Sequence, residues 1–158
     1  MLAALLLAAA APAASPASPR FDPLRFFAGA TEGWGRLKIV FRRTRAVQVR
    51  GTGRIEQDGT LVLDQRVEEE GKPPATRRWR IRAVAPGRYA GTLSDATGPV
   101  TGEAEGDRLH LSYPARNGVR IDQRLVLSPD GRSARNRLTA RKLGMVVARL
   151  DETIRRTD

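Results

Sequence analysis

The sequence predicts an all-β protein, an antiparallel up-and-down β-barrel that follows a short N-terminal helix or turn. Apolar and polar residues alternate with a period of two along most of the chain, as in half-buried strands. Short turn sequences rich in Gly, Pro and Asp separate these segments, and no long helical pattern lies between them. This spacing is typical of a barrel or a sandwich. The consecutive tight turns favour the barrel, whose closure also removes exposed strand edges.

The clearest hairpin lies between residues 119 and 144. In residues 119–127, one apolar face alternates with a mostly charged face. Residues 128–131, Ser-Pro-Asp-Gly, predict a tight turn, because Pro fixes φ at the second position and Gly is free to take a positive φ. The chain returns over residues 133–142 with Leu138 on the apolar face, so this stretch predicts a β-hairpin.

The other strands come in close succession and bring the predicted total to about ten. Their apolar faces carry Leu37, Ile39 and Phe41; Val47, Val49 and Ile55; Leu61, Leu63 and Val67; Trp79 and Ile81; Tyr89 and Leu93; Leu109, Leu111 and Tyr113; and Val146, Ala148, Leu150 and Ile154. Residues 100–105 form the weakest predicted strand. Gly51 and Gly53 lie on an apolar face, where they permit a bend or the close approach of another backbone.

The N-terminal residues predict export. Residues 1–14 are a Leu- and Ala-rich run whose Ala11-Pro12-Ala13 resembles a signal-peptidase site, although no Lys or Arg precedes the run. The run is too short to span a bilayer as a helix. The alternative to a signal peptide is that these residues form a buried Ala-rich helix. We expect a signal peptide and linker in residues 1–19 and a single barrel domain in residues 20–158. The protein would then be periplasmic or secreted, with no transmembrane span.

A short capped helix or turn is predicted within residues 21–30. Asp22-Pro23 is a typical helix start, and Phe26 and Phe27 supply apolar side chains. We expect this segment to close one end of the barrel.

Composition and charge narrow the classes of function. No cysteine is present, which excludes disulfides, thiolate catalysis, Cys-ligated metals and a lipid anchor on an N-terminal cysteine. The formal net charge is +11. The basic residues, mostly Arg, are spread over nearly all the predicted strands, which is typical of a solvated outer face. The alternative is an anionic partner such as lipopolysaccharide or acidic lipid.

Polar side chains interrupt the apolar faces and are the candidates for a binding site. They are Gln65, Glu69, Tyr113, Gln123, Asn136 and Glu152. A polar group buried without a partner costs about 1–3 kcal/mol, so such groups bond to one another, to water or to a ligand. Mostly apolar walls with a few polar groups are typical of a small-molecule pocket. If these residues instead lie near the barrel ends, they are solvated.

No catalytic, metal-binding or cofactor-binding motif is visible in the sequence. His110 is the only histidine, and its alternation with two leucines predicts that it points outward. A zinc site with one His and no Cys would depend on carboxylates. Residues 68–70, Glu-Glu-Glu, predict a solvated loop in preference to a cation site.

Nucleic-acid binding is disfavoured. Basic residues flank Trp79, as in a stacking platform for bases. Alternation places Trp79 on the face opposite Arg78 and Arg80, so the interleaving of basic and aromatic groups on one surface is weak.

Short motifs in a fixed order extend from Phe26 to Arg155. They are Phe26-Phe27 and Gly29 with Gly33-Trp34-Gly35, then Arg78-Trp79, then Tyr89 and Gly91-Thr92 with Asp95 and Gly98, then Asn136-Arg137 and Lys142-Leu143-Gly144. In these motifs the chain resembles the DUF3833 family, a bacterial family of unknown function.

The resemblance implies a small exported protein with a lipocalin-like barrel, and it implies no catalytic residue. It also implies a lipid anchor in many members, for which this chain has no cysteine. A second departure lies at Ile121-Asp122-Gln123, where the family is expected to have Asp-Asp-Trp.

We therefore expect an exported lipocalin-like protein that holds a small apolar or amphipathic molecule in its barrel. The predicted ligand-binding residues are Trp34, Trp79 and Tyr89 to line or close the cavity, Gln65, Tyr113, Gln123 and Asn136 for polar contacts, and Arg78 and Lys142 at the rim to attract an anionic head group.

Two alternatives stay open. A non-catalytic envelope protein would bind lipopolysaccharide or acidic lipid through a basic surface, and ionic strength would weaken this binding. An isomerase or hydrolase would need a titratable pair inside the barrel, such as Glu152 with Tyr113 or Asp122 with Arg78. No such pair follows from the spacing, and no cofactor is expected.

Overall fold

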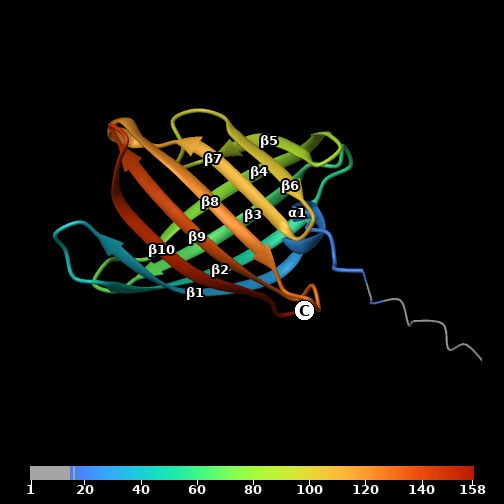
Figure 1. The fold of residues 1–158 in the computed structure, drawn as a ribbon, viewed down its shortest axis with the longest axis horizontal. Coiled ribbons are helices and arrows are strands. Elements are labelled where there is room, and N and C mark those ends of the chain that lie inside the picture. Colours follow the sequence, from blue (N-terminus) through green and yellow to red (C-terminus); the bar gives the residue numbers. More distant parts are fainter. Residues whose placement is uncertain (1–14, 16) are drawn as a thin grey trace, which may run out of the picture.

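The computed structural model describes residue 15 and residues 17–158, and its strands form one closed antiparallel barrel (Figure 1). The strands are β1 (Gly29–Ile39), β2 (Arg45–Ile55), β3 (Leu61–Glu69), β4 (Ala75–Ala85), β5 (Arg88–Leu93), β6 (Val100–Glu105), β7 (Arg108–Pro114), β8 (Val119–Leu127), β9 (Ser133–Lys142) and β10 (Met145–Arg156). Each strand pairs with its neighbour in sequence, and β1 pairs with β10 to close the ring. The predicted up-and-down barrel is confirmed.

The hairpin of residues 119–144 forms as its alternation predicts. Ile121 lies opposite Ala140, and Gln123 lies opposite Leu138. Gly131 takes a positive φ of 70° in the turn, which an L side chain rarely adopts. The weakly predicted strand β6 is also present, between β5 and β7.

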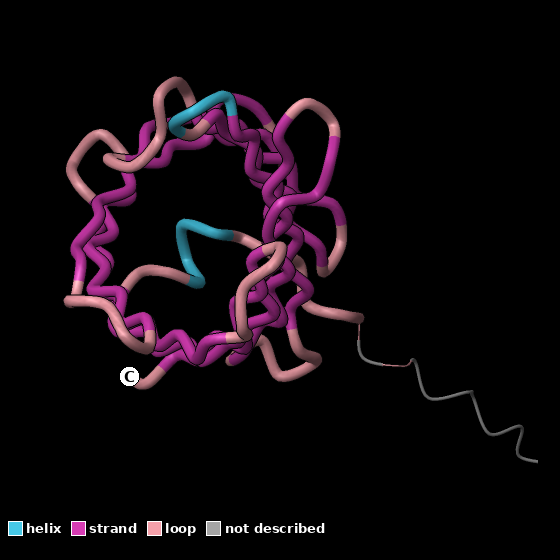
Figure 2. Tube along the Cα trace, turned by 90° about the vertical axis from the view of Figure 1, so that its left-hand side faces the viewer, coloured by secondary structure: helices cyan, strands magenta, loops and turns pink. Residues whose placement is uncertain are grey.

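The helix α1 (Pro23–Phe26) closes one end of the barrel, as predicted. Figure 2 looks along the barrel and shows α1 inside the ring of strands. Asp22 caps the helix, because its Oδ1 accepts hydrogen bonds from the backbone N–H groups of residues 24 and 25. Phe21, Phe26 and Phe27 are buried in the main apolar core. A Cβ at Gly53 would lie 1.8 Å from the carbonyl oxygen of Phe27, so glycine is what lets this segment dock.

The barrel interior holds two apolar clusters. The larger one joins α1 to the inward side chains of β3 to β10, among them Leu61, Leu109 and Leu125. The smaller one lies toward the opposite end and consists of Val47, Val49 and Leu150, with Leu37, Val67 and Leu138 packed against it. Polar side chains lie between the two clusters, and they form the site described below.

Two strand boundaries differ from the sequence-based prediction. Phe41 does not continue the apolar face of Leu37 and Ile39, because β1 ends at Ile39 and Phe41 lies fully exposed in the following turn. Residues 68–70 form a solvated loop only in part, because β3 runs to Glu69 and only Glu70 lies exposed in the turn. The Oε1 of Glu69 is 2.9 Å from the guanidinium of Arg45, and both side chains are less than one-fifth exposed.

The predicted signal sequence of residues 1–14 lies outside the described residues. Among the residues that are described, no helix has the length and apolar character needed to cross a membrane.

Candidate functional site

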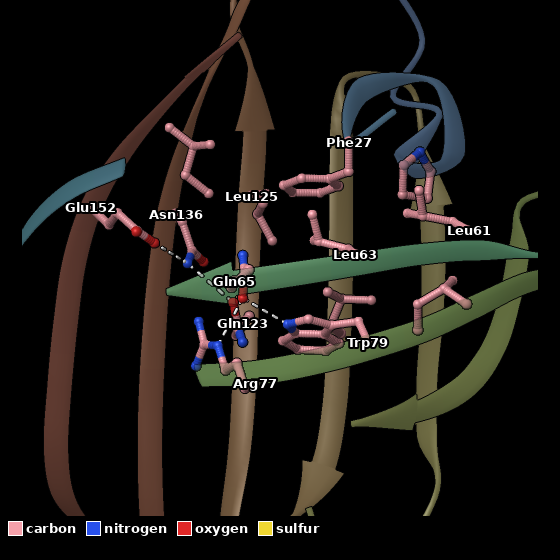
Figure 3. A pocket seen from close by; sticks show the side chains of 14 residues that line it. Phe27, Leu61, Leu63, Gln65, Arg77, Trp79, Gln123, Leu125, Asn136 and Glu152 are labelled. Carbon is pink, nitrogen blue, oxygen red and sulfur yellow. Dashed lines mark hydrogen bonds between the residues drawn. The ribbon is translucent and has the colours of Figure 1, made fainter. Parts of the chain in front are cut away.

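A small cavity lies inside the barrel between α1 and the polar side chains (Figure 3). Its volume is about 40 Å³, which is room for roughly three water molecules. Apolar side chains form most of its wall, and the labelled ones include Phe27, Leu61, Leu63 and Leu125. Gln65, Arg77 and Trp79 form one polar side, and Gln123, Asn136 and Glu152 form another.

The first polar side centres on the Gln65 carbonyl. Gln65 Oε1 accepts hydrogen bonds from Arg77 Nε at 2.7 Å and from Trp79 Nε1 at 2.8 Å. The guanidinium carbon of Arg77 also lies 5.7 Å from the centroid of the Trp79 ring, within the range of a cation–π contact. These bonds fix three side chains from neighbouring strands β3 and β4.

The second polar side is a buried chain of hydrogen bonds from Glu152 to Tyr113. Asn136 Nδ2 donates to Glu152 Oε2 at 3.0 Å and to Gln123 Oε1 at 3.1 Å. Gln123 Nε2 donates to the Tyr113 hydroxyl at 3.1 Å. All four residues are at most 9% exposed. They come from β7, β8, β9 and β10, and Asn136 lies opposite Glu152 in the ladder.

One atom in this series of hydrogen-bonded side chains has no hydrogen-bond partner. Asn136 Oδ1 is fully buried and accepts no hydrogen bond from any described residue. Both protons of the Asn136 amide already donate hydrogen bonds, to Gln123 and Glu152. Exchanging the amide nitrogen and oxygen by a 180° rotation would break both of these hydrogen bonds. A buried acceptor of this kind carries a desolvation cost of about 1–3 kcal/mol unless something donates to it.

Burial also acts on the phenol of Tyr113. Desolvation raises the pKa of Tyr113 above its ordinary value of 10.0, and the charge of Arg77 and the hydrogen bond from Gln123 only partly oppose this. The hydroxyl is therefore protonated at neutral pH and keeps one proton to donate. The Tyr113 ring packs edge-to-face on Trp79 with centroids 5.6 Å apart, which links the two polar sides.

The structure brings together most of the predicted polar residues. Gln65, Trp79, Gln123 and Asn136 line the cavity, and Tyr113 is bonded to Gln123. Their roles in ligand binding stay predictions.

The other predicted residues lie elsewhere. Trp34 does not line the cavity, because its side chain is 46% exposed on the outer face. The two glycines beside it, Gly33 and Gly35, lie against the Glu152 side chain on the inner face. Arg78 lies on the outer wall, where its Nε donates to Asp64 Oδ1 at 2.6 Å. Tyr89 is half-buried against the main core outside the cavity wall, and Lys142 is exposed at the end opposite α1.

Arg77 and Phe27 are among the cavity residues that were not predicted to bind a ligand. Alternation already places Arg77 on the face of Trp79, so its inward position was a usable signal. Phe27 was expected only to help close the barrel end. Its contact with the cavity depends on how α1 docks.

Neither titratable pair considered for catalysis forms. Glu152 and Tyr113 are separated by the amides of Asn136 and Gln123. Asp122 lies on the outer wall, where its Oδ1 is 2.8 Å from His110 Nε2, in keeping with the outward direction predicted for that histidine. No group of three or more His, Cys, Asp or Glu side chains placed to hold a metal ion occurs in the described part of the chain.

Comparison with known proteins places this barrel in a family. The family model for DUF3833, "Protein of unknown function", matches residues 8–156. The chain belongs to the DUF3833 family. No curated protein matches it.

Solved structures with similar folds are lipocalin-like barrels at low sequence identity. The S-type phycobiliprotein lyase CPES from Guillardia theta has a TM-score of 0.66 and 7% identity, with 85% of this chain and 90% of that chain covered. Rv2717c from M. tuberculosis has a TM-score of 0.61 and 16% identity, with 85% and 95% covered. A DUF3598 protein of unknown function from Nostoc punctiforme has a TM-score of 0.59 and 12% identity, with 92% and 53% covered. At these identities the likeness concerns the fold.

Proposed function

We propose that this DUF3833 protein is an exported binding protein that holds a small amphipathic molecule in its barrel. The observation that carries the proposal is the unpartnered Asn136 Oδ1, which is buried beside the cavity. A ligand hydroxyl or amino group would donate to this oxygen and offset its desolvation cost. The Glu152 carboxylate, bonded to the same Asn136 amide, is a second acceptor for such a group.

The apolar wall determines the orientation of the ligand, and the cavity volume limits its size. Leu61, Leu63 and Phe27 lie on the α1 side of the polar residues, so the apolar part of the molecule would point toward α1. The volume of about 40 Å³ favours a molecule of few atoms, because a ligand site for a drug-sized molecule is roughly ten times larger. Export rests on the signal-like residues 1–14.

Binding is tested with two measurements. Native mass spectrometry of freshly purified protein checks for a bound molecule. The probes ethanol, ethylamine and propane, each of three heavy atoms, are then titrated into a Trp34→Phe variant, in which Trp79 is the only tryptophan and reports from the cavity wall. We expect the alcohol and the amine to change Trp79 fluorescence at lower concentration than propane.

Two variants separate the site from the rest of the barrel. Asn136→Ala should weaken binding of the alcohol about tenfold, which corresponds to one lost buried hydrogen bond. Gln57→Ala removes an exposed amide in the turn between β2 and β3 and should leave binding unchanged. A clean native mass together with an unresponsive Trp79 would contradict the proposal.

A further inference from the structure

The barrel end opposite α1 carries large apolar side chains that point into solvent. Phe41 is 102% exposed, Leu143 90%, Met145 69% and Val40 41%. We call these four residues the apolar tip. They lie in and beside the β1–β2 and β9–β10 turns, which are neighbours because β1 pairs with β10 and Val40 N donates to the carbonyl of Val147 at 3.0 Å. Figure 1 shows both turns at the left end of the barrel.

Two tip residues occupy backbone conformations that their side chains disfavour. Phe41 has a φ of 61° and Leu143 a φ of 51°, in the left-handed region that favours Gly and Asn. Leu143 and Gly144 form the two-residue turn between β9 and β10, where Asn-Gly is the favoured pair. Large apolar residues at two such positions do not help the barrel to fold, which points to a use outside it.

Cations surround the apolar tip. Arg36, Lys38, Arg42, Lys142 and Arg149 are exposed, and within the described part of the chain none of them forms an ion pair. We call these five residues the cationic rim.

The rim is unfavourable for the protein on its own. Lys38 lies directly opposite Arg149 in the β1–β10 ladder, and like charges in that position repel. Both residues line a shallow hollow between the two turns, together with Val40 and Val146. The acidic residue of that hollow, Asp151, is paired with Arg137 at 2.8 Å. An anion between Lys38 and Arg149 would relieve the repulsion.

We propose that the apolar tip and the cationic rim bind the surface of an anionic phospholipid bilayer. Phe41 and Leu143 would insert at the level of the head groups, and Lys38 and Arg149 would contact lipid phosphates. The unpaired positive charge selects an anionic surface. Two separate protruding turns fit a deformable lipid surface better than the flat, continuous patch typical of a protein interface. None of these residues lines the cavity, so this proposal stands or falls separately from the proposed ligand binding.

Vesicle co-sedimentation tests the proposal. The probes are vesicles of phosphatidylglycerol and phosphatidylcholine in equal parts, with vesicles of phosphatidylcholine alone for comparison. We expect the protein to pellet with the mixed vesicles, to pellet less with phosphatidylcholine alone, and to be released as ionic strength rises.

Two double variants probe the two parts of the surface. Phe41→Asn/Leu143→Asn should weaken binding at least about tenfold through lost apolar burial, while Asn relaxes the backbone at both positions so that the barrel stays folded. Lys38→Gln/Arg149→Gln should weaken it about thirtyfold, because each basic residue near an anionic surface contributes about fivefold.

Matched controls lie at the α1 end of the barrel. Ile55→Ser/Val84→Ser replaces two apolar residues that are 48% and 54% exposed, and Arg135→Gln/Arg155→Gln removes two exposed cations. Both controls should bind nearly as well as the unmodified protein. Absence of binding to the mixed vesicles, or equal losses in the tip variants and the controls, would overturn the proposal. So would sedimentation equilibrium showing that the tip residues instead hold two copies of the chain together.

Discussion

The two ends of this barrel use the same kinds of side chain in opposite ways. At one end Phe21, Phe26 and Phe27 are all less than one-tenth exposed, because α1 folds into the ring and covers the interior. At the other end Phe41 and Leu143 are almost completely exposed. The number of apolar residues therefore does not decide which end is closed. A segment from outside the meander closes the α1 end. The other end has only the connections between its own strands, and the β1–β2 and β9–β10 turns there point their apolar side chains outward.

The largest difference between the ends should appear in stability. Phe26→Ala opens a cavity in the main core and should lower the free energy of unfolding by about 3–5 kcal/mol. Phe41→Ala removes no buried contact and should change it by no more than about 0.5 kcal/mol. Urea unfolding followed by circular dichroism measures both values. Similar losses in the two variants would mean that Phe41 is covered in solution.

A smaller effect of opposite sign is expected at the exposed turn. Leu143→Asn should raise the free energy of unfolding by about 0.5–1 kcal/mol, because Asn tolerates the left-handed conformation better than Leu. Met145→Asn is the matched control, because Met145 is also exposed but has an ordinary φ at the start of β10. It should show no gain in the same unfolding experiment. If Leu143→Asn destabilises the protein, Leu143 makes contacts that its exposure does not indicate.

The smallest expected effect is a loss of stability at the α1 end at acidic pH. Three exposed carboxylates at the α1 end accept hydrogen bonds that lower their pKa values below the ordinary 3.8. The main donors are Thr60 N–H for Asp58, the Ser128 hydroxyl for Asp130 and Ala30 N–H for Asp158. Each folded-state pKa is lower than the unfolded one, so the stabilisation is present above the unfolded pKa. It is lost as the pH falls through the folded value, and therefore below about pH 4.

Amide hydrogen exchange locates this acid effect. Below about pH 4 the N–H groups of Ala30, Thr60 and Arg132 should lose protection relative to those of the β9–β10 turn, after correction for the intrinsic exchange rate. Asp58→Asn should reduce the effect at Thr60 and leave Ala30 unchanged. A uniform loss of protection over both ends would contradict the assignment to these carboxylates.

The local pattern predicts most of the fold. The alternation in residues 119–127, the Ser-Pro-Asp-Gly turn and the Asp22 cap all form as expected, because each depends on residues adjacent in sequence. The prediction that Phe41 continues the apolar face was wrong, because alternation alone does not show that β1 ends at Ile39. Trp34 was expected to line or close the cavity, but its side chain points outward. It has the same parity along β1 as the exposed Arg36 and Lys38, and this parity was not applied to it in the prediction.

The candidate site is predictable only in part. Alternation places Gln65, Gln123 and Asn136 on inward faces, and the structure has them there. It does not predict that Asn136 bonds Gln123 and Glu152 at once, because those partners lie on two other strands. It also does not predict the unpaired Asn136 Oδ1, which depends on where all the neighbouring donors point.

The sequence by itself determined the strands, the turns, the capped helix and the charge of the outer wall, since a period of two and turn chemistry are local properties. Only the tertiary structure decided what meets inside the barrel. Closing the ring between β1 and β10 brings Glu152 beside Gly33, more than a hundred residues away, and the docking of α1 leaves a cavity of about 40 Å³ between its side chains and the polar groups. Contacts across a closed ring depend on the register of all ten strands together, and no short segment carries that information.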